Sequence, residues 1–309
     1  MTDTATSRFL AFRRSLPRPP RLEHRTVRAR GIDFAVFLSP EVPGATPLLC
    51  INGGLIFDHG ILWPALSPLA ARRQLVLYDQ RGRGRTPAPP GARAARIEHD
   101  AGDVPALREA LGIARWDVLG HSWGGGIAVL GVALDLARDP EAVRRLVLVD
   151  AVGPTGWWLP RLVPDGVARL AARGDARGAE DLRAFLSEDI ARPDPALHAR
   201  YARALYPAWF ADPELARLLS PPHARSATGA AVAARLRTEG YDWRASVRAL
   251  RVPTLVIHGD GDLLPVAVAR EIGAELPQAQ VAIVPDAGHM PFWESPARFF
   301  ELVEDFLAR

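Results

Sequence analysis

Short runs of apolar residues recur along the chain and predict eight β-strands. The runs lie at about 26–30, 32–38, 48–52, 75–79, 116–120, 146–150, 254–258 and 281–284. The first two alternate apolar and polar residues and are separated by Gly31, which predicts a β-hairpin. Most of the later runs are apolar throughout, as expected of strands that are buried on both faces of a parallel sheet.

Longer segments with helical periodicity separate the later strands. They predict helices at about 103–112, 124–138, 265–276 and 295–308. Alternation of strands and helices is typical of an α/β fold, in which helices cover both faces of a mostly parallel sheet. We therefore expect an eight-stranded, mostly parallel sheet flanked by helices.

One interval, residues 154–245, interrupts this alternation. It has no clear strand pattern, and prolines separate amphipathic segments that predict short helices at about 161–173, 179–191 and 226–239. An all-helical insertion after the sixth strand is expected to cap the carboxyl ends of the strands, where open parallel sheets bind ligands. The expected division is an N-terminal arm (1–25), loosely attached, an α/β core (26–153 and 246–309) and a helical cap (154–245).

A candidate nucleophile lies in the strongest local motif, Gly-His-Ser-Trp-Gly at 120–124. The motif follows an apolar run and precedes a helical segment, which is the strand–turn–helix context of a nucleophilic serine. Such a turn projects the hydroxyl of Ser122 above the sheet, at the N-terminus of a helix. The helix dipole and the next backbone N–H both favour a developing anion there.

A serine nucleophile needs a base, and the base needs a carboxylate that orients it. Asp262 follows the strand predicted at 254–258, and His289 lies in a turn of small residues after the last strand. The order Ser, Asp, His along the chain is the one that this architecture uses. Asp260 and Asp286 are alternative acids, and Asp262 is preferred because a short turn should direct its side chain toward the carboxyl edge of the sheet.

Two glycine-rich turns are expected beside the nucleophile. In the sequence Asn-Gly-Gly-Leu at 52–55, glycine lets the backbone approach a substrate oxygen closely, so we predict an oxyanion hole formed by the backbone N–H groups of Gly54 and Trp123. The sequence Tyr-Asp-Gln-Arg-Gly-Arg-Gly-Arg-Thr at 78–86 is basic but lacks the spacing of a phosphate loop. We predict that this second turn supports the oxyanion loop.

The composition narrows the chemistry. The chain has 309 residues, and its 38 basic residues are all arginines, which 35 acidic residues balance to a net charge of +3. Without lysine, a Schiff base on a side-chain amine is excluded. A charge of +3 over this length is a weak field, so no nucleic-acid partner is expected. We expect Arg81, Arg83 and Arg85 to be the only arginines near the active site.

The remaining composition predicts an ordinary globular enzyme. The single cysteine, Cys50, cannot form an internal disulfide and lies in an apolar run, so it is predicted to be a core residue. No run of about 18 apolar residues predicts a membrane span, and the first 25 residues lack the apolar stretch of a signal peptide. A cytoplasmic enzyme without a membrane partner is expected.

Together these motifs resemble the α/β-hydrolase superfamily over about residues 26–308. The sequences at 78–86 and 120–125 are most similar to its proline iminopeptidase-like branch, although Asn-Gly-Gly-Leu-Ile at 52–56 replaces the usual His-Gly-Gly-Pro-Gly. The resemblance implies a nucleophile at Ser122, an acid at Asp262 and a base at His289. The turn at 120–125 also resembles that of epoxide hydrolases, with serine in place of their aspartate. A serine would leave an ether that water cannot cleave, so Ser122 indicates attack on an acyl carbonyl.

The expected function is that of a cofactor-independent serine hydrolase without a metal, acting on an ester, amide or thioester of a small to medium apolar substrate. Candidate walls of an apolar pocket are Trp157, Trp158, Trp209, Phe210, Phe292 and Trp293. Alternative functions are a proline iminopeptidase, a carbon–carbon bond hydrolase, a tailoring enzyme of secondary metabolism, and a ligand-binding homologue without turnover. The partner is a small molecule, and both monomer and homodimer remain open.

Overall fold

The computed structural model describes residues 4–91, 95–219, 221 and 224–309. Residues 1–3 of the expected arm and residues 220, 222 and 223 of the expected cap lie outside the described residues. All eight predicted strands are present in one sheet. They are β1 (Glu23–Ala29), β2 (Ile32–Leu38), β3 (Leu48–Ile51), β4 (Leu75–Tyr78), β5 (Trp116–His121), β6 (Val143–Val149), β7 (Thr254–Gly259) and β8 (Ala279–Val284).

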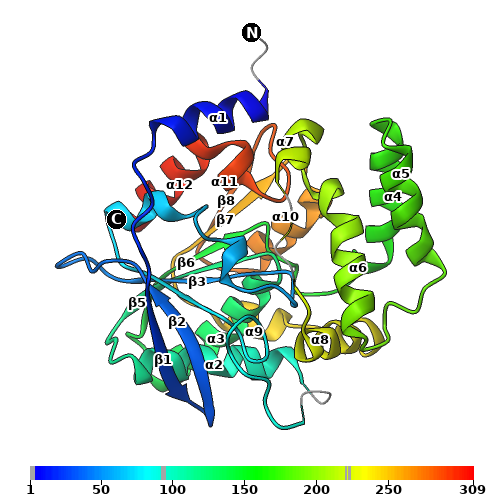
Figure 1. Ribbon diagram of the computed structural model, residues 1–309. Coiled ribbons are helices and arrows are strands. Elements are labelled where there is room, and N and C mark those ends of the chain that lie inside the picture. The colour runs from blue at the N-terminus through cyan, green and yellow to red at the C-terminus, as the bar shows by residue number, and fades with distance from the viewer. Residues whose placement is uncertain (1–3, 92–94, 220, 222–223) are drawn as a thin grey trace.

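The sheet is mostly parallel, with the strand order β1-β2-β4-β3-β5-β6-β7-β8. The expected hairpin is confirmed, since β1 and β2 pair antiparallel from Ala29 opposite Ile32 outward. β2 also runs antiparallel to β4, and every later pair is parallel. The carboxyl ends of β3 to β8 therefore meet at one edge of the sheet (Figure 1).

Both faces of the central strands are buried. Leu49 and Ile51 of β3 belong to one hydrophobic core, whereas Leu48 and Cys50 belong to the core on the opposite face, because successive side chains of a strand point to opposite sides. This explains why the later strands have no polar face. It also confirms Cys50 as a buried residue, and burial raises the pKa of its thiol.

Helices cover both cores. Residues of α2, α3 and α10 contribute to the first core, and residues of α12 to the second. Outside the interval between β6 and β7, the described helices are α1 (Ala5–Ser15), α2 (Ile97–Ala110), α3 (Trp123–Arg138), α10 (Val266–Glu275), α11 (Pro291–Glu294) and α12 (Pro296–Ala308).

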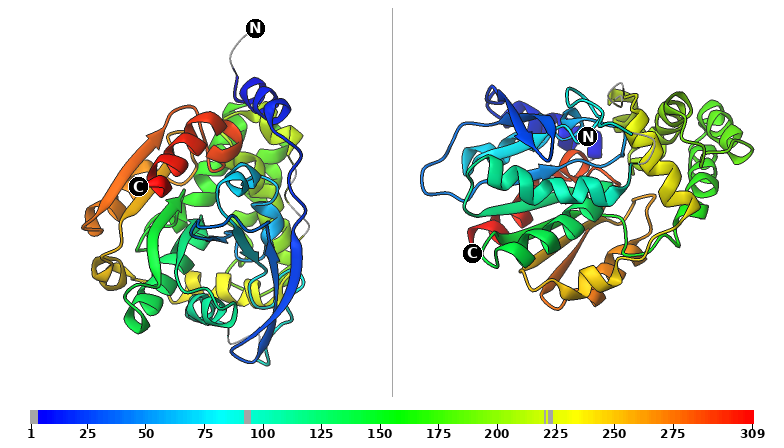
Figure 2. Two further views of the ribbon diagram at one scale, coloured as in Figure 1. Left: turned by 90° about the vertical axis from the view of Figure 1, so that its left-hand side faces the viewer. Right: turned by 90° about the horizontal axis from the view of Figure 1, so that it is seen from below.

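Between β6 and β7 the described helices are α4 (Leu162–Ala172), α5 (Ala176–Arg183), α6 (Pro195–Leu205), α7 (Pro213–Leu218), α8 (Ala227–Thr238) and α9 (Arg244–Ala249). Helices α4 to α8 and their connections lie at the carboxyl edge of the sheet, and we call them the cap (Figure 2). Helix α9 packs instead on α3 and α10 of the core. The α/β architecture with helices inserted after the sixth strand agrees with the sequence prediction.

One cap helix differs from its prediction. The segment expected to be helical over 179–191 instead contains α5, which ends at Arg183, followed by a short 3-10 turn. The helix begins early because the side chain of Asp175 accepts a hydrogen bond from the Gly178 N–H. Leu186 is 57% exposed, so it belongs to no buried helical face. Because leucine is apolar, it extended the helical pattern in the sequence beyond the true end of the helix.

The N-terminal segment is docked on the core, so the expectation of a loosely attached arm is wrong. The backbone N–H and the hydroxyl of Thr6 in α1 both donate to the carboxylate of Asp212, at 2.9 and 3.1 Å. Phe12 stacks on Phe300 of α12, with ring centroids 5.4 Å apart. Helix α1 therefore contacts both the cap, at Asp212, and the C-terminal helix α12, at Phe300. Among the described residues, no helix has the length and apolar character needed to cross a membrane.

Candidate active site

Ser122 lies in a strained turn between β5 and α3. Its backbone has φ 56° and ψ −125°, a conformation that L-residues rarely adopt. The turn is held by hydrogen bonds from the Ser122 N–H to the Val149 carbonyl (2.9 Å) and from the Gly125 N–H to the Ser122 carbonyl (2.9 Å). Strain of this kind costs about 1–3 kcal/mol and persists only where the surrounding structure fixes it.

Glycines are required around this turn by close packing. A Cβ atom on Gly124 would overlap the backbone carbonyl of Ile51, and a Cβ atom on Gly120 would overlap the carbonyl of Gly124. Helix α3 therefore begins directly against the end of β3. The glycines of the motif at 120–124 thus permit the close approach of these backbones, as the strand–turn–helix prediction requires.

His289 and Asp262 meet at the same edge of the sheet. His289 Nδ1 lies 2.8 Å from Oδ2 of Asp262, and both side chains are buried. The two alternative acids, Asp260 and Asp286, are exposed. Burial alone would raise the pKa of Asp262, but the charge and hydrogen bond of His289 lower it below its usual value. The contact favours an ionised Asp262 that fixes the orientation of the imidazole.

A second buried carboxyl group, Asp150, lies behind this pair. It directly follows β6, and one of its carboxylate oxygens lies within 4.8 Å of a carboxylate oxygen of Asp262 and of a ring nitrogen of His289. Oδ1 of Asp150 accepts a hydrogen bond from the Gly259 N–H at 2.8 Å. Burial raises the pKa of Asp150 well above its usual value, and the negative charge of Asp262 raises it further. The arrangement keeps Asp150 protonated beside an ionised Asp262.

Two ionisable side chains, Arg169 and Glu294, brace the loops that carry Asp262 and His289. Arg169 of α4 donates to the backbone carbonyls of Gly261 (2.8 Å) and Asp262 (2.9 Å). Glu294 accepts hydrogen bonds from the Gly288 N–H (2.7 Å) and from two N–H groups of the cap, those of residues 211 and 212. Both side chains join the cap to the loops of the core. Neither role could be predicted from the sequence, because both depend on how the cap packs.

The glycine-rich turn after β3, residues 52–55, lies against Ser122. A Cβ atom on Gly53 would overlap the side chain of Ser122, and Gly54 adopts a positive φ of 79°. Gly54 and Trp123 both line the cavity that contains Ser122. The side chain of Gln80 donates to the Asn52 carbonyl at 2.7 Å, so the turn is held from the adjacent strand end.

The loop at 78–86 supports this turn, as predicted. Arg83 donates to the Leu55 carbonyl at 2.7 Å and forms a fully buried, bidentate ion pair with Asp100 at 2.8 and 3.0 Å. Arg81 pairs in the same way with Asp103. Because each guanidinium group is paired with a buried carboxylate, Arg81 and Arg83 have a structural role. The expectation that these arginines are the ones near the active site is therefore wrong, and Arg237 lines the cavity instead.

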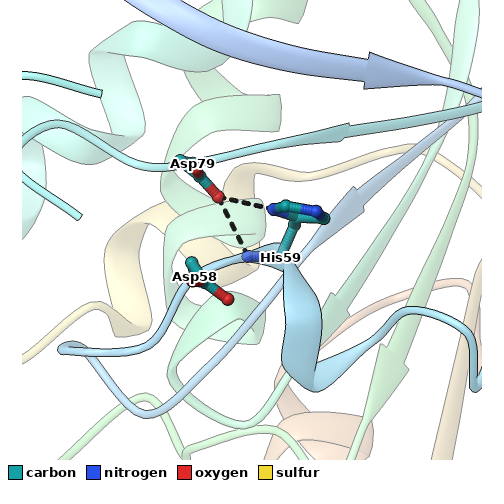
Figure 3. Close-up of side chains that lie close together, drawn as sticks. All are labelled: Asp58, His59 and Asp79. Atoms are coloured by element: carbon teal, nitrogen blue, oxygen red, sulfur yellow. Dashed lines mark hydrogen bonds and ion pairs between the residues drawn. The ribbon is translucent and has the colours of Figure 1, made fainter. Parts of the chain in front are cut away.

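Among the described residues, two groups of side chains have the composition of a metal site. One consists of Asp150, Asp262 and His289, and the other of Asp58, His59 and Asp79. Figure 3 shows the Asp79 carboxylate directed at the ring and backbone nitrogens of His59, at 2.7 and 3.1 Å. Its other oxygen accepts from the Arg85 N–H, and Asp58 accepts from Gly60. These hydrogen bonds connect the loops that carry Asp58, His59 and Asp79, so we interpret the second group as structural.

A mostly apolar cavity opens above Ser122 and His289. Its lining comes from the turn after β3, the start of α3, the loop after β7 and the cap, and includes Leu55, Phe57, Ile61, Leu159, Leu162, Leu205, Tyr206 and Leu264. Of the six aromatic residues predicted as walls, Trp158 and Trp209 line it. Trp209 stacks on His289 with ring centroids 4.2 Å apart.

The other four predicted walls lie elsewhere. Trp157 is 45% exposed and donates to Glu271. Phe210 and Phe292 are core residues in the second hydrophobic core, and Trp293 packs on Phe9 of α1. Aromatic residues are as useful in a core as in a pocket, so the sequence could not separate the two roles.

The fold and this site define a hydrolase of α/β architecture. A family model described as alpha/beta hydrolase fold matches residues 46–296, and the chain belongs to that family. It is 31% identical over 272 residues to a 2-hydroxymuconate semialdehyde hydrolase of Pseudomonas sp. (strain CF600), covering 85% of this chain and 87% of that protein. It is 26% identical over 293 residues to a proline iminopeptidase of Lactobacillus delbrueckii subsp. bulgaricus, covering 86% and 91%.

A solved structure has the same architecture. The enol-lactonase from Burkholderia xenovorans LB400 is 25% identical, with a TM-score of 0.63 over 93% of this chain and all of that one.

Proposed function

We propose that the protein is a cofactor-independent serine hydrolase that cleaves an ester, amide or thioester through an acyl-enzyme. The observation that carries the proposal is the 2.8 Å contact between His289 Nδ1 and Asp262, made in a cavity that Ser122 also lines. With Nδ1 held by Asp262, Nε2 is the ring nitrogen left to take the proton of Ser122.

The proposed reaction has two halves. His289 accepts the proton of Ser122 as the serine oxygen attacks the acyl carbon, and the imidazolium then protonates the leaving group. The N–H groups of Gly54 and Trp123 stabilise the oxyanion, a contribution of about 3–4 kcal/mol for each donor. In the second half, His289 activates water, which attacks the acyl-enzyme, and the released proton returns to Ser122. Atoms and charge balance without a redox partner.

The walls of the cavity favour an apolar substrate. Aliphatic and aromatic side chains from the oxyanion turn and the cap surround Ser122, and burial of an acyl chain against them supplies about 25 cal/mol per Å² of apolar surface. We therefore expect turnover of esters that carry a small to medium acyl group and an activated leaving group.

The decisive experiment combines turnover with labelling. We expect wild-type protein to hydrolyse 4-nitrophenyl alkanoates and to be labelled by a fluorophosphonate probe, and Ser122→Ala to lose both. Ser187→Ala, at an exposed cap position, is the matched control and should keep both. Unchanged hydrolysis or labelling in Ser122→Ala would overturn the assignment of the nucleophile.

A second candidate is hydrolysis of a carbon–carbon bond. It is supported by the 31% identity to 2-hydroxymuconate semialdehyde hydrolase, since a triad of this kind can also serve that reaction. A vinylogous 1,5-diketone is the test substrate: loss of its absorbance with wild-type protein, and not with Ser122→Ala, would support this candidate over simple ester cleavage.

An iminopeptidase is the weaker alternative. Recognition of a substrate amino group needs a carboxylate in the pocket, and none occurs among the described residues of the lining. We therefore expect a prolyl arylamide to be hydrolysed much more slowly than an activated ester of similar size.

A further inference from the structure

The cavity contains one permanently charged side chain among its described lining residues, that of Arg237. Arg237 lies on α8, and its neighbours in the lining, Tyr201 and Leu205 on α6, are uncharged. His121, the last residue of β5, and His289, after β8, also line the cavity but come from the core and not from the cap. A cation in an apolar cavity is costly unless a partner compensates it.

No described carboxylate forms an ion pair with Arg237. Its neighbour on the same helix, Arg235, pairs with Glu239 at 2.8 Å, and Glu239 also binds Arg96 at 2.7 Å. The guanidinium carbon of Arg237 instead lies 5.2 Å from the centre of the Tyr201 ring. This contact orients the guanidinium without neutralising it, because an aromatic face carries no net charge. Nε of Arg237 is buried and has no hydrogen-bond partner in the described structure.

One further polar group beside Arg237, the Tyr201 hydroxyl, is buried and lacks a hydrogen-bond partner among the described residues. Burial raises the pKa of Tyr201, so its hydroxyl remains a donor. His198 also lines the cavity, and burial together with the charge of Arg237 lowers its pKa, so it adds no second charge. Unsatisfied donors of this kind are expected where a ligand supplies the acceptor.

We propose that Arg237, with the Tyr201 hydroxyl, forms an anion subsite that binds a carboxylate at the distal end of the acyl chain. The inference rests on the proposed function, because it names the substrate class of the same site: half-esters, amides or thioesters of aliphatic dicarboxylic acids. The apolar walls contact the methylene chain, and the guanidinium of Arg237 donates hydrogen bonds to its terminal carboxylate. A guanidinium binds a carboxylate through two parallel N–H bonds, which gives selectivity over a methyl group.

The test compares matched pairs of substrates. The 4-nitrophenyl half-esters of adipic, pimelic and suberic acid carry a terminal carboxylate, and 4-nitrophenyl hexanoate, heptanoate and octanoate have the same chain lengths without it. We expect wild-type protein to favour the carboxylate at one chain length or more, by about tenfold or more in kcat/KM. Arg237→Gln should lower that preference about 10- to 100-fold, and Arg237→Lys should retain part of it.

Arg235→Gln is the matched control, since it makes the same change on the same helix at an arginine that already has a partner. Its preference should equal that of wild-type protein. Preference for the neutral ester at every chain length, or an equal ratio in wild-type and Arg237→Gln protein, would overturn the subsite.

A binding measurement separates this result from failure of the proposed function. Calorimetric titration of monomethyl suberate into Ser122→Ala, and into the double variant Ser122→Ala/Arg237→Gln, needs no turnover. About tenfold weaker binding in the double variant supports the anion subsite even if no ester is hydrolysed. Equal binding in both proteins refutes it, whatever the esterase assay shows.

Discussion

The indole of Trp209 lies nearly parallel to the imidazole of His289, with ring centroids 4.2 Å apart and an angle of 26° between the planes. The backbone carbonyl of Trp209 also accepts a hydrogen bond from the backbone N–H of His289 at 2.8 Å. Trp209 belongs to the cap, whereas His289 lies on the loop after β8. The cap therefore holds the orientation of the proposed base as well as covering the cavity.

Replacing this stacking ring should slow the reaction. In Trp209→Ala, His289 loses the aromatic face that restrains the orientation of its ring. We expect kcat/KM on a 4-nitrophenyl alkanoate to fall about fivefold or more, with recovery in Trp209→Phe. Trp157→Phe, on an exposed tryptophan of the same segment, is the control and should behave as wild type. A Trp209→Ala protein with unchanged kinetics would show that stacking contributes nothing.

The two neighbouring carboxyl groups should respond differently to amide substitution. Asp262→Asn removes the charge that orients and stabilises His289, so we expect kcat to fall about 10⁴-fold. Asp150 is held protonated, and asparagine keeps the carbonyl oxygen that accepts from Gly259. Asp150→Asn should therefore lose less than about tenfold. Steady-state kinetics on both variants makes the comparison, and equal losses would contradict the assignment of charge.

Acid should destabilise the fold through His121. Burial lowers the pKa of His121 to about 3, and its Nε2 lies 2.9 Å from the His289 carbonyl. The unfolded chain takes up this proton near the usual value of about 6.5, whereas the folded protein does so only near 3. The stability that this neutral histidine contributes is present above about pH 6.5 and is lost as the pH falls toward 3.

His121→Gln tests this pH dependence. Glutamine can replace the side-chain contact to the carbonyl without titrating. Chemical unfolding at a series of pH values should show a smaller loss of unfolding free energy in the variant than in wild-type protein between about pH 6.5 and 4. Parallel curves for the two proteins would rule out His121 as a source of the acid sensitivity.

Breaking the buried pair of Arg83 and Asp100 should strongly destabilise the protein. Arg83→Met leaves an uncompensated buried carboxylate and frees the Leu55 carbonyl, and we expect a loss of about 3–5 kcal/mol. The matched control is Arg298→Met, which removes an exposed pair with Glu301 and should cost about 1 kcal/mol or less. Urea unfolding of both variants measures the difference. A small effect of Arg83→Met would contradict the structural role of the 78–86 loop.

The sequence by itself determined the strands, the position of the helical insertion and the residues of the proposed triad. Strands buried on both faces carry continuous apolar runs, and the serine turn needs glycines at fixed positions, so these features are local. Asp262 and His289 were also accessible because each directly follows a strand of a parallel sheet, and such strand ends meet at one edge.

Only the tertiary structure decided which residues surround that edge. Asp150, Arg169, Glu294 and Arg237 act through contacts between segments far apart in the chain, and their immediate neighbours in sequence do not reveal those contacts. For the same reason the sequence could not separate Trp209, which stacks on His289, from Phe210, which is a core residue next to it. The sequence also predicted that Arg81, Arg83 and Arg85 would be the only arginines near the active site. Packing instead pairs Arg83 with Asp100 and leaves Arg237 in the cavity without a carboxylate among the described residues.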